Sequence, residues 1–154
     1  MTHIRRLVAV FVMAGSIAAC ALGSGSSYVD RVATPADAKV LAGAMADFVA
    51  GRLPAGSSAV ILDPTSYEQA ANALTPAFVA ALRDRGFAVA DASQAAAPHT
   101  HRIRYLVTRL YNGDLLRVTI DGGAAEVSRL FVRNSAGDLQ AGGPFTVRQM
   151  VGAN

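Results

Sequence analysis

The spacing of apolar positions divides the chain into a helical half and an extended half. Apolar residues recur at intervals of three and four between residues 34 and 50 and between 73 and 85, which predicts two amphipathic helices. Short apolar runs at 58–62 and 87–89 are typical of buried strands. From residue 102 onward the period changes to two, which predicts strands with one buried face.

The helices carry recognisable end signals. Thr34 suits an N-cap, Asp37 lies where a carboxylate meets free backbone N–H groups, and Gly51 is expected to end the first helix. Thr65–Glu68 matches a capping box and predicts the start of a second helix. Pro76 either kinks that helix or follows the cap of a new one, and the sequence leaves both alternatives open.

Turn signals organise the second half. Strands are expected on either side of Asn112–Asp114 and Gly122–Gly123, and Phe145–Val147 is expected to close the sheet. The order strand, helix, glycine, strand over residues 58–89 predicts a parallel crossover. We therefore predict an α+β fold, a small two-layer domain with two or three helices on a mostly antiparallel sheet that ends in a β-meander.

The beginning of the chain has a different pattern. Arg5 and Arg6 precede an uncharged apolar run from Leu7 to Ala19. A basic head, an apolar run and small residues at its end are the layout of a secretory signal. The run is shorter than the roughly 20 apolar residues that a bilayer span requires.

Cys20, the only cysteine, follows this run directly. The segment Ile17-Ala18-Ala19-Cys20 resembles the lipobox of bacterial lipoproteins, which implies cleavage before Cys20 and acylation of its thiol. An ordinary cleaved signal is the alternative. Ala21 stands where many lipoproteins of the inner membrane have Asp, so the resemblance implies the periplasmic face of the outer membrane.

These features divide the chain into a signal peptide at 1–19, a lipidated Cys20 with a flexible linker at 20–33, and one periplasmic domain at 34–150. Without Arg5 and Arg6, 12 basic and 11 acidic residues remain, a net charge of +1. This balance does not favour binding to nucleic acid. With 52% apolar residues the chain can build a core without disulfides.

Catalytic and metal-binding patterns are weak. His99 and His101 form a His-x-His pair, but no cysteine or suitably spaced carboxylate completes a ligand set, so we interpret them as solvated loop residues. The chain shows no nucleophile with a base and an orienting group. We expect neither an enzyme nor a metal, and no cofactor other than the covalent lipid.

Five arginines of the second half alternate with apolar residues, so most of them are expected to share the exposed face of the sheet. Arginine is favoured at protein interfaces because its planar fork pairs with carboxylates and stacks on aromatic rings. This face is therefore either a partner-contact surface or a solvated sheet face. The five are Arg102, Arg104, Arg117, Arg129 and Arg133.

The lipobox, the capped helix from Thr34, the segment Ala59–Leu62 and the run Ala73–Val89 together resemble the TrbH family. These are small lipoproteins of Trb-type conjugal transfer systems, a branch of the type IV secretion machinery. The resemblance carries over Cys20 as the acylated residue and no catalytic residue.

The resemblance implies a structural component of a conjugative type IV secretion channel, anchored at the outer membrane by its lipid. Its expected partners are the other subunits of the channel core complex, in an oligomeric ring, with no direct contact to nucleic acid. The alternative is a periplasmic lipoprotein that recruits or regulates another envelope protein.

Overall fold

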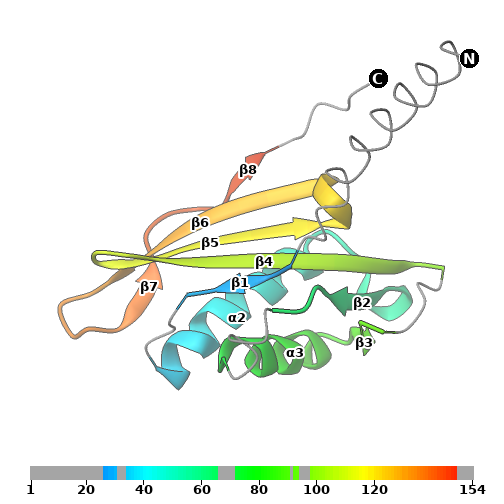
Figure 1. Cartoon of the computed structure of the whole chain (residues 1–154), viewed down its shortest axis with the longest axis horizontal. Helices are drawn as coiled ribbons and strands as arrows, with labels where there is room; N and C mark the ends of the chain where they lie inside the picture. Colours follow the sequence, from blue (N-terminus) through cyan, green and yellow to red (C-terminus); the bar gives the residue numbers. More distant parts are fainter. Residues whose placement is uncertain (1–25, 31–33, 66–71, 91, 94–97, 149–154) are drawn as a thin grey trace, which may run out of the picture.

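In the computed structural model of the protein, the helices lie on one side of a long twisted sheet (Figure 1). The residues that the structure describes are 26–30, 34–65, 72–90, 92–93 and 98–148. Within them the chain forms two α-helices and eight strands.

The first helix, α2 (Pro35–Ala50), begins and ends where the sequence predicts. The Thr34 side chain accepts a hydrogen bond from the Asp37 backbone N–H at 3.0 Å, and Gly51 is the C-cap. Leu41, Met45 and other residues of one face are fully buried. Val40 also continues the apolar spacing predicted between residues 34 and 50, but it is 39% exposed.

The second helix, α3 (Leu74–Asp84), is a newly capped helix and carries Pro76 in its first turn. The Asn72 side chain accepts a hydrogen bond from the Thr75 N–H at 2.8 Å, so Asn72 satisfies a free donor at this end. The buried residues Leu74, Phe78 and Leu82 lie four positions apart along one face. Most of the predicted capping box lies in residues 66–71, outside the described residues.

The sheet has the order β3-β2-β4-β5-β6-β7, with β1 beside β4 and β8 beside β6. The strand β2 pairs in parallel with β3 and β4, and β4, β5, β6 and β7 form an antiparallel meander. The bounds are β1 (Tyr28–Val29), β2 (Ala59–Leu62), β3 (Ala88–Ala90), β4 (Thr100–Leu110), β5 (Gly113–Ile120), β6 (Ala125–Arg133), β7 (Leu139–Ala141) and β8 (Thr146–Arg148).

This arrangement confirms the α+β class, the meander and the parallel crossover from β2 through α3 to β3. The sheet has more strands than the predicted small domain suggests. It is mixed, because β1 and β2 each pair in parallel with β4, and β3 pairs in parallel with β2. The strand β1 lies within the segment expected to be a linker. Part of that segment is therefore a strand of the folded domain.

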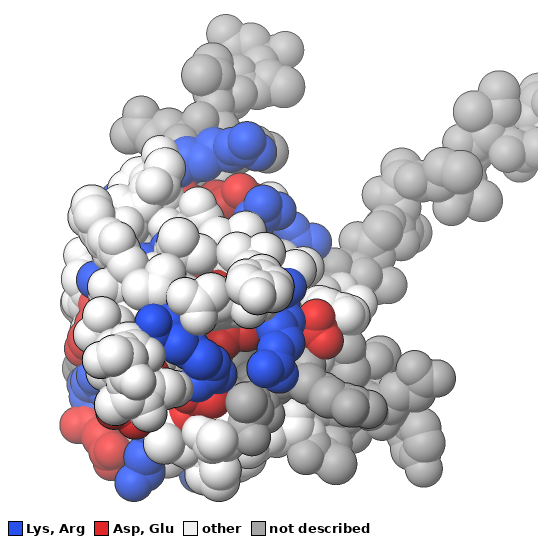
Figure 2. Space-filling model, turned by 90° about the vertical axis from the view of Figure 1, so that its left-hand side faces the viewer, with Lys and Arg blue, Asp and Glu red and all other residues white. Residues whose placement is uncertain are grey.

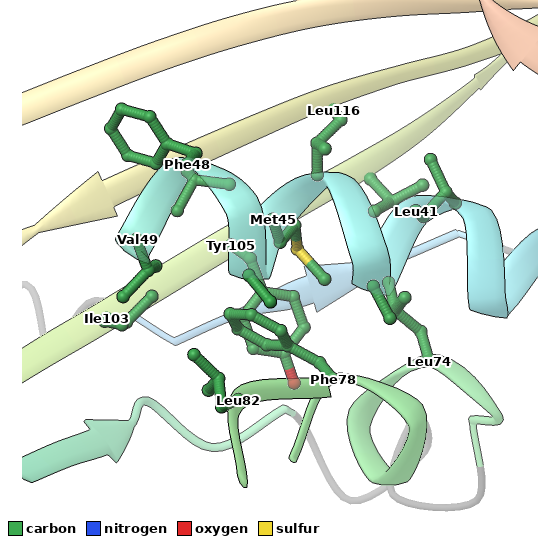
Figure 3. Packing of buried hydrophobic residues seen from close by; sticks show 14 of the residues in the cluster. Leu41, Met45, Phe48, Val49, Leu74, Phe78, Leu82, Ile103, Tyr105 and Leu116 are labelled. Carbon is green, nitrogen blue, oxygen red and sulfur yellow. The ribbon is translucent and has the colours of Figure 1, made fainter. Parts of the chain in front are cut away.

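The core lies between the helices and one face of the sheet (Figure 3). Tyr105 of β4 is fully buried at its centre, with its ring edge-on to Phe78 of α3 at 5.6 Å between centroids. Its hydroxyl lies 2.7 Å from the Thr75 Oγ1, so the one polar atom of this ring is satisfied. Burial raises the pKa of Tyr105 and keeps the hydroxyl protonated.

Candidate partner-binding surface

The strand register assigns each residue of the meander to one of two faces. Tyr105 pairs with Val118 and Val118 with Val127, and all three are buried against the helices. Residues of this parity form the inner face. Residues of the opposite parity form what we call the outer face, which neither α2 nor α3 covers (Figure 1).

The five predicted arginines do not share one face. Arg102, Arg104 and Arg117 lie on the outer face, as expected. Arg129 pairs with Leu116, a buried core residue, so Arg129 lies on the inner face, and Arg133 follows it there four residues later. The prediction that most of the five share one face therefore holds for three of them and fails for Arg129 and Arg133. The reason is that β6 has apolar residues at both odd and even positions, so its sequence does not show which set faces the helices.

The Arg133 side chain binds at the N-terminus of α2. Its Nη1 and Nη2 donate to the two carboxylate oxygens of Asp37 at 3.2 and 2.9 Å, and Nη1 also donates to the Gly137 carbonyl at 2.8 Å. The Asp37 side chain is 4% exposed. The hydrogen bonds from Arg133 lower the pKa of Asp37, because they favour its ionised form.

Arg129 is held at the other end of α2. Its guanidinium lies 4.8 Å from the ring centroid of Phe145 and 5.6 Å from that of Phe131, and its Nε donates to the Gly143 carbonyl at 2.7 Å. Phe145 in turn contacts Phe48 of α2 at 5.7 Å between centroids. Arg129 thus fastens the connection between β7 and β8 to the domain, and it has a structural role.

The three outer-face arginines differ in their contacts. The Arg102 Nη1 donates to the Asp63 Oδ1 at 2.6 Å, and the Arg117 Nε lies 3.8 Å from the Glu126 Oε1. Arg104 has no ion-pair partner among the described residues. Of the five arginines, it is therefore the one most available to an external carboxylate.

Apolar side chains share the outer face with these arginines, and we call them the outer apolar patch. They lie toward the turn between β4 and β5, where Thr108 pairs with Leu115 and Leu115 with Leu130. Leu110 and Leu130 are each 42% exposed. The members of the patch are Leu106, Leu110, Leu115, Leu130 and Val132. Sequence reasoning missed this patch because it assigned the apolar residues of the strands to the core.

A hollow of about 310 Å³ opens beside the patch. Its walls come from β5, β6 and the connection between β7 and β8. They include Leu115, Leu130, Ser128 and Pro144. A hollow of this kind gives the otherwise flat sheet face a feature into which one side chain of a partner can fit.

The end of the molecule with the turn between β4 and β5 is shown in Figure 2, where basic and acidic side chains lie next to one another among wide uncharged areas. Asp114 lies on the inner face of β5 at this end and is 3% exposed. Burial raises the pKa of Asp114, and the positive charges of Arg133 and Arg109 partly oppose that rise.

His101 differs from the expected solvated loop residue. It lies in β4, and its Nδ1 is 2.7 Å from the Asp121 Oδ2, while the other oxygen of Asp121 accepts from the Arg102 N–H at 2.9 Å. This pair fastens the start of β4 to the turn after β5. Across the part of the chain that the structure describes, no group of three or more His, Cys, Asp or Glu side chains could hold a metal ion.

The predicted lipobox, Ile17 to Ala19, and Cys20 lie outside the described residues. Among the residues that are described, neither helix has the length and apolar character that crossing a membrane requires. The lipid anchor therefore stays a prediction from the sequence.

The fold and this surface define a small α+β domain with helices on one face of its sheet and a second face that neither helix covers. A family model described as conjugal transfer protein TrbH matches residues 22–150. The chain therefore belongs to the TrbH family, which confirms the resemblance and makes it a conjugal-transfer-related protein. Neither the curated proteins nor the solved structures gave a significant match.

Proposed function

We propose that this protein is a lipid-anchored structural component of a conjugative type IV secretion channel, at the periplasmic face of the outer membrane. Membership of a conjugal transfer family supports a role in conjugation. The lipobox at Ile17–Cys20 supports the anchor. In this role the protein contacts other subunits of the channel core, in an oligomeric ring, and it needs no cofactor apart from its lipid.

The observation that carries the proposal is how soon after Cys20 the chain enters the fold. Ser27 is 2% exposed, its N–H donates to the Pro64 carbonyl at 3.0 Å, and its Oγ accepts from the Tyr105 N–H at 3.3 Å. Ser27 lies seven positions after Cys20, so a fully extended tether between them spans at most about 25 Å.

A tether of this length keeps the domain at the membrane surface. A diffusing recruiter gains from a long reach, whereas a fixed building block needs a fixed position, and the short tether favours the second. Several acyl chains on Cys20 would make the attachment almost permanent, because each buried methylene contributes about 0.8 kcal/mol.

The test compares the wild-type protein with Cys20→Ser and Ala21→Asp in donor cells that carry the neighbouring transfer genes. We expect lipid mass on the wild-type protein and sedimentation with the outer membrane. Cys20→Ser is expected to stay unprocessed and to lower transfer. Ala21→Asp is the matched control, which keeps the lipid and moves the protein to the inner membrane.

If Cys20→Ser is cleaved and soluble like the wild-type protein, Cys20 is not a lipid anchor. The free periplasmic binding module is then the better account. If Ala21→Asp transfers plasmid as efficiently as the wild type, the outer-membrane location is wrong even where the lipid is present.

A further inference from the structure

We propose that the outer face of the sheet is the docking surface for a partner protein whose contact area has an apolar centre and an acidic border. This inference rests on the proposed function, because it identifies the surface by which the domain joins its neighbours. The outer apolar patch supplies the centre, and Arg104 with Arg117 supplies the complementary charge.

The first argument is exposure. Leu110 and Leu130 keep 42% of their surface in solvent, and Tyr111 at the turn next to Leu110 is fully exposed. Tyr111 contributes no burial to the fold, yet tyrosine is among the residues enriched in interfaces because its ring is apolar and its hydroxyl is polar. Exposed apolar side chains that gather into one patch bordered by polar residues are typical of an interaction site.

The second argument is charge. Asp63 and Glu126 already lie next to Arg102 and Arg117, whereas Arg104 has no ion-pair partner within the described residues. A carboxylate brought by a partner would therefore pair with Arg104.

The same charge argues against a second copy of this chain as the occupant. A second copy would bring Asp63 and Glu126, which already lie beside Arg102 and Arg117, so among the described residues of this face it would supply Arg104 with no carboxylate that is still without a cation. The hollow of about 310 Å³ between Leu115, Leu130 and Pro144 argues for a protein over a lipid surface, because it fits a discrete apolar side chain.

The experiment places a photo-crosslinking amino acid at Leu130 in the full-length protein, in donor cells that express the transfer genes. A matched probe replaces Val40, which is similarly exposed but lies on α2, on the opposite layer. We expect the probe at Leu130 to form an adduct with a channel subunit, and the probe at Val40 to form none with that subunit.

Three variants and one control then test the chemistry of the surface. Arg104→Glu is expected to lower the adduct yield about tenfold or more, as for the loss of a central interface residue, and Arg104→Lys is expected to retain most of it. Tyr111→Ala is expected to lower the yield with no change in unfolding, so that a loss of binding is separated from a loss of folding. Arg83→Glu, an exposed charge on α3, is the control and should change nothing.

Other outcomes overturn the inference. An adduct of two copies of the chain would identify a homodimer surface, and a lipid adduct would identify a membrane-facing surface. An equal yield at Leu130 and Val40, or no adduct at Leu130, would show that the outer face is not docked. None of these results changes the expected lipidation of Cys20, so failure of the docking surface is distinguishable from failure of the proposed function.

Discussion

Arg133→Ala is expected to be one of the most damaging substitutions in the domain, although its side chain lies near the surface. Arg133 contacts both carboxylate oxygens of Asp37, at the third position of α2, and also the Gly137 carbonyl in the turn before β7. The substitution would leave the Asp37 carboxylate buried without its cation, and it would release the turn.

The magnitude follows from the burial of the two partners. Removing one partner of a buried pair costs about 3–5 kcal/mol. The Arg133 side chain is 23% exposed, so water would reach part of the carboxylate and the cost is expected at the lower end, about 3 kcal/mol. Asp37→Asn should destabilise the protein less, by about 1–2 kcal/mol, because Arg133 can turn toward solvent. The hydrogen bond from the Asp37 backbone N–H to the Thr34 side chain also remains.

The loss of unfolding free energy caused by Arg133→Ala is also expected to depend on pH. The pKa of Asp37 is lowered from its ordinary value of 3.8, mainly by the hydrogen bonds from Arg133. A group with a depressed folded pKa stabilises the protein above its unfolded pKa and loses this contribution as the pH falls through the folded pKa. The difference between wild type and Arg133→Ala should therefore be largest at neutral pH and should shrink at about pH 3 and below.

Urea unfolding followed by circular dichroism measures these free energies for the wild type, both single variants and the double variant. The double variant should cost less than the sum of the single variants, because the two residues interact directly. Our reasoning is refuted if Arg133→Ala costs no more than Asp37→Asn at neutral pH. It is also refuted if the cost of Arg133→Ala is the same at acid pH.

Three further predictions use the same unfolding assay. Asp114→Asn should raise stability at neutral pH, because burial raises the pKa of Asp114 and ionisation of the folded protein therefore costs free energy. This gain should be lost as the pH falls through the raised folded pKa toward about 4, and a gain that persists in acid would contradict the prediction. Arg129→Ala should cost about 1–2 kcal/mol through the lost ring contacts and the bond to Gly143, with Arg129→Lys recovering less than half. Thr119→Val should be neutral or stabilising by up to about 1 kcal/mol, because the Thr119 hydroxyl has no partner within the described residues, and a clear loss would show that it does have one.

The helices were predictable because their signals are local. Thr34, Asp37 and Gly51 each act within one turn of the helix end, so the sequence around α2 is enough to place it. The start of α3 was left open, because its capping side chain, Asn72, competes with the earlier signal at Thr65–Glu68. Two adequate capping signals close together cannot be ranked by spacing alone.

The faces of the sheet were less predictable, because a period of two does not say which parity is inside. In β6, Val127 and Phe131 have one parity, and Leu130 and Val132 have the other. Both sets look like a core face. Pairing of Val127 with the buried Val118 decides between them, and that pairing depends on strands far apart in the sequence. Arg129 was therefore assigned to the wrong face, and the outer apolar patch was not recognised.

The position of β1 links the proposed anchor to the proposed docking surface. Tyr28 pairs with Leu106, a member of the outer apolar patch, and Tyr28 is 45% exposed. Among the described residues, the chain therefore joins the sheet beside the outer apolar patch. With at most about 25 Å of tether between Cys20 and Ser27, a partner that docks on this face must present its acidic and apolar contact area close to the membrane surface. If Cys20 is acylated as proposed, a partner that lies only deep in the periplasm is not expected to reach both the patch and Arg104.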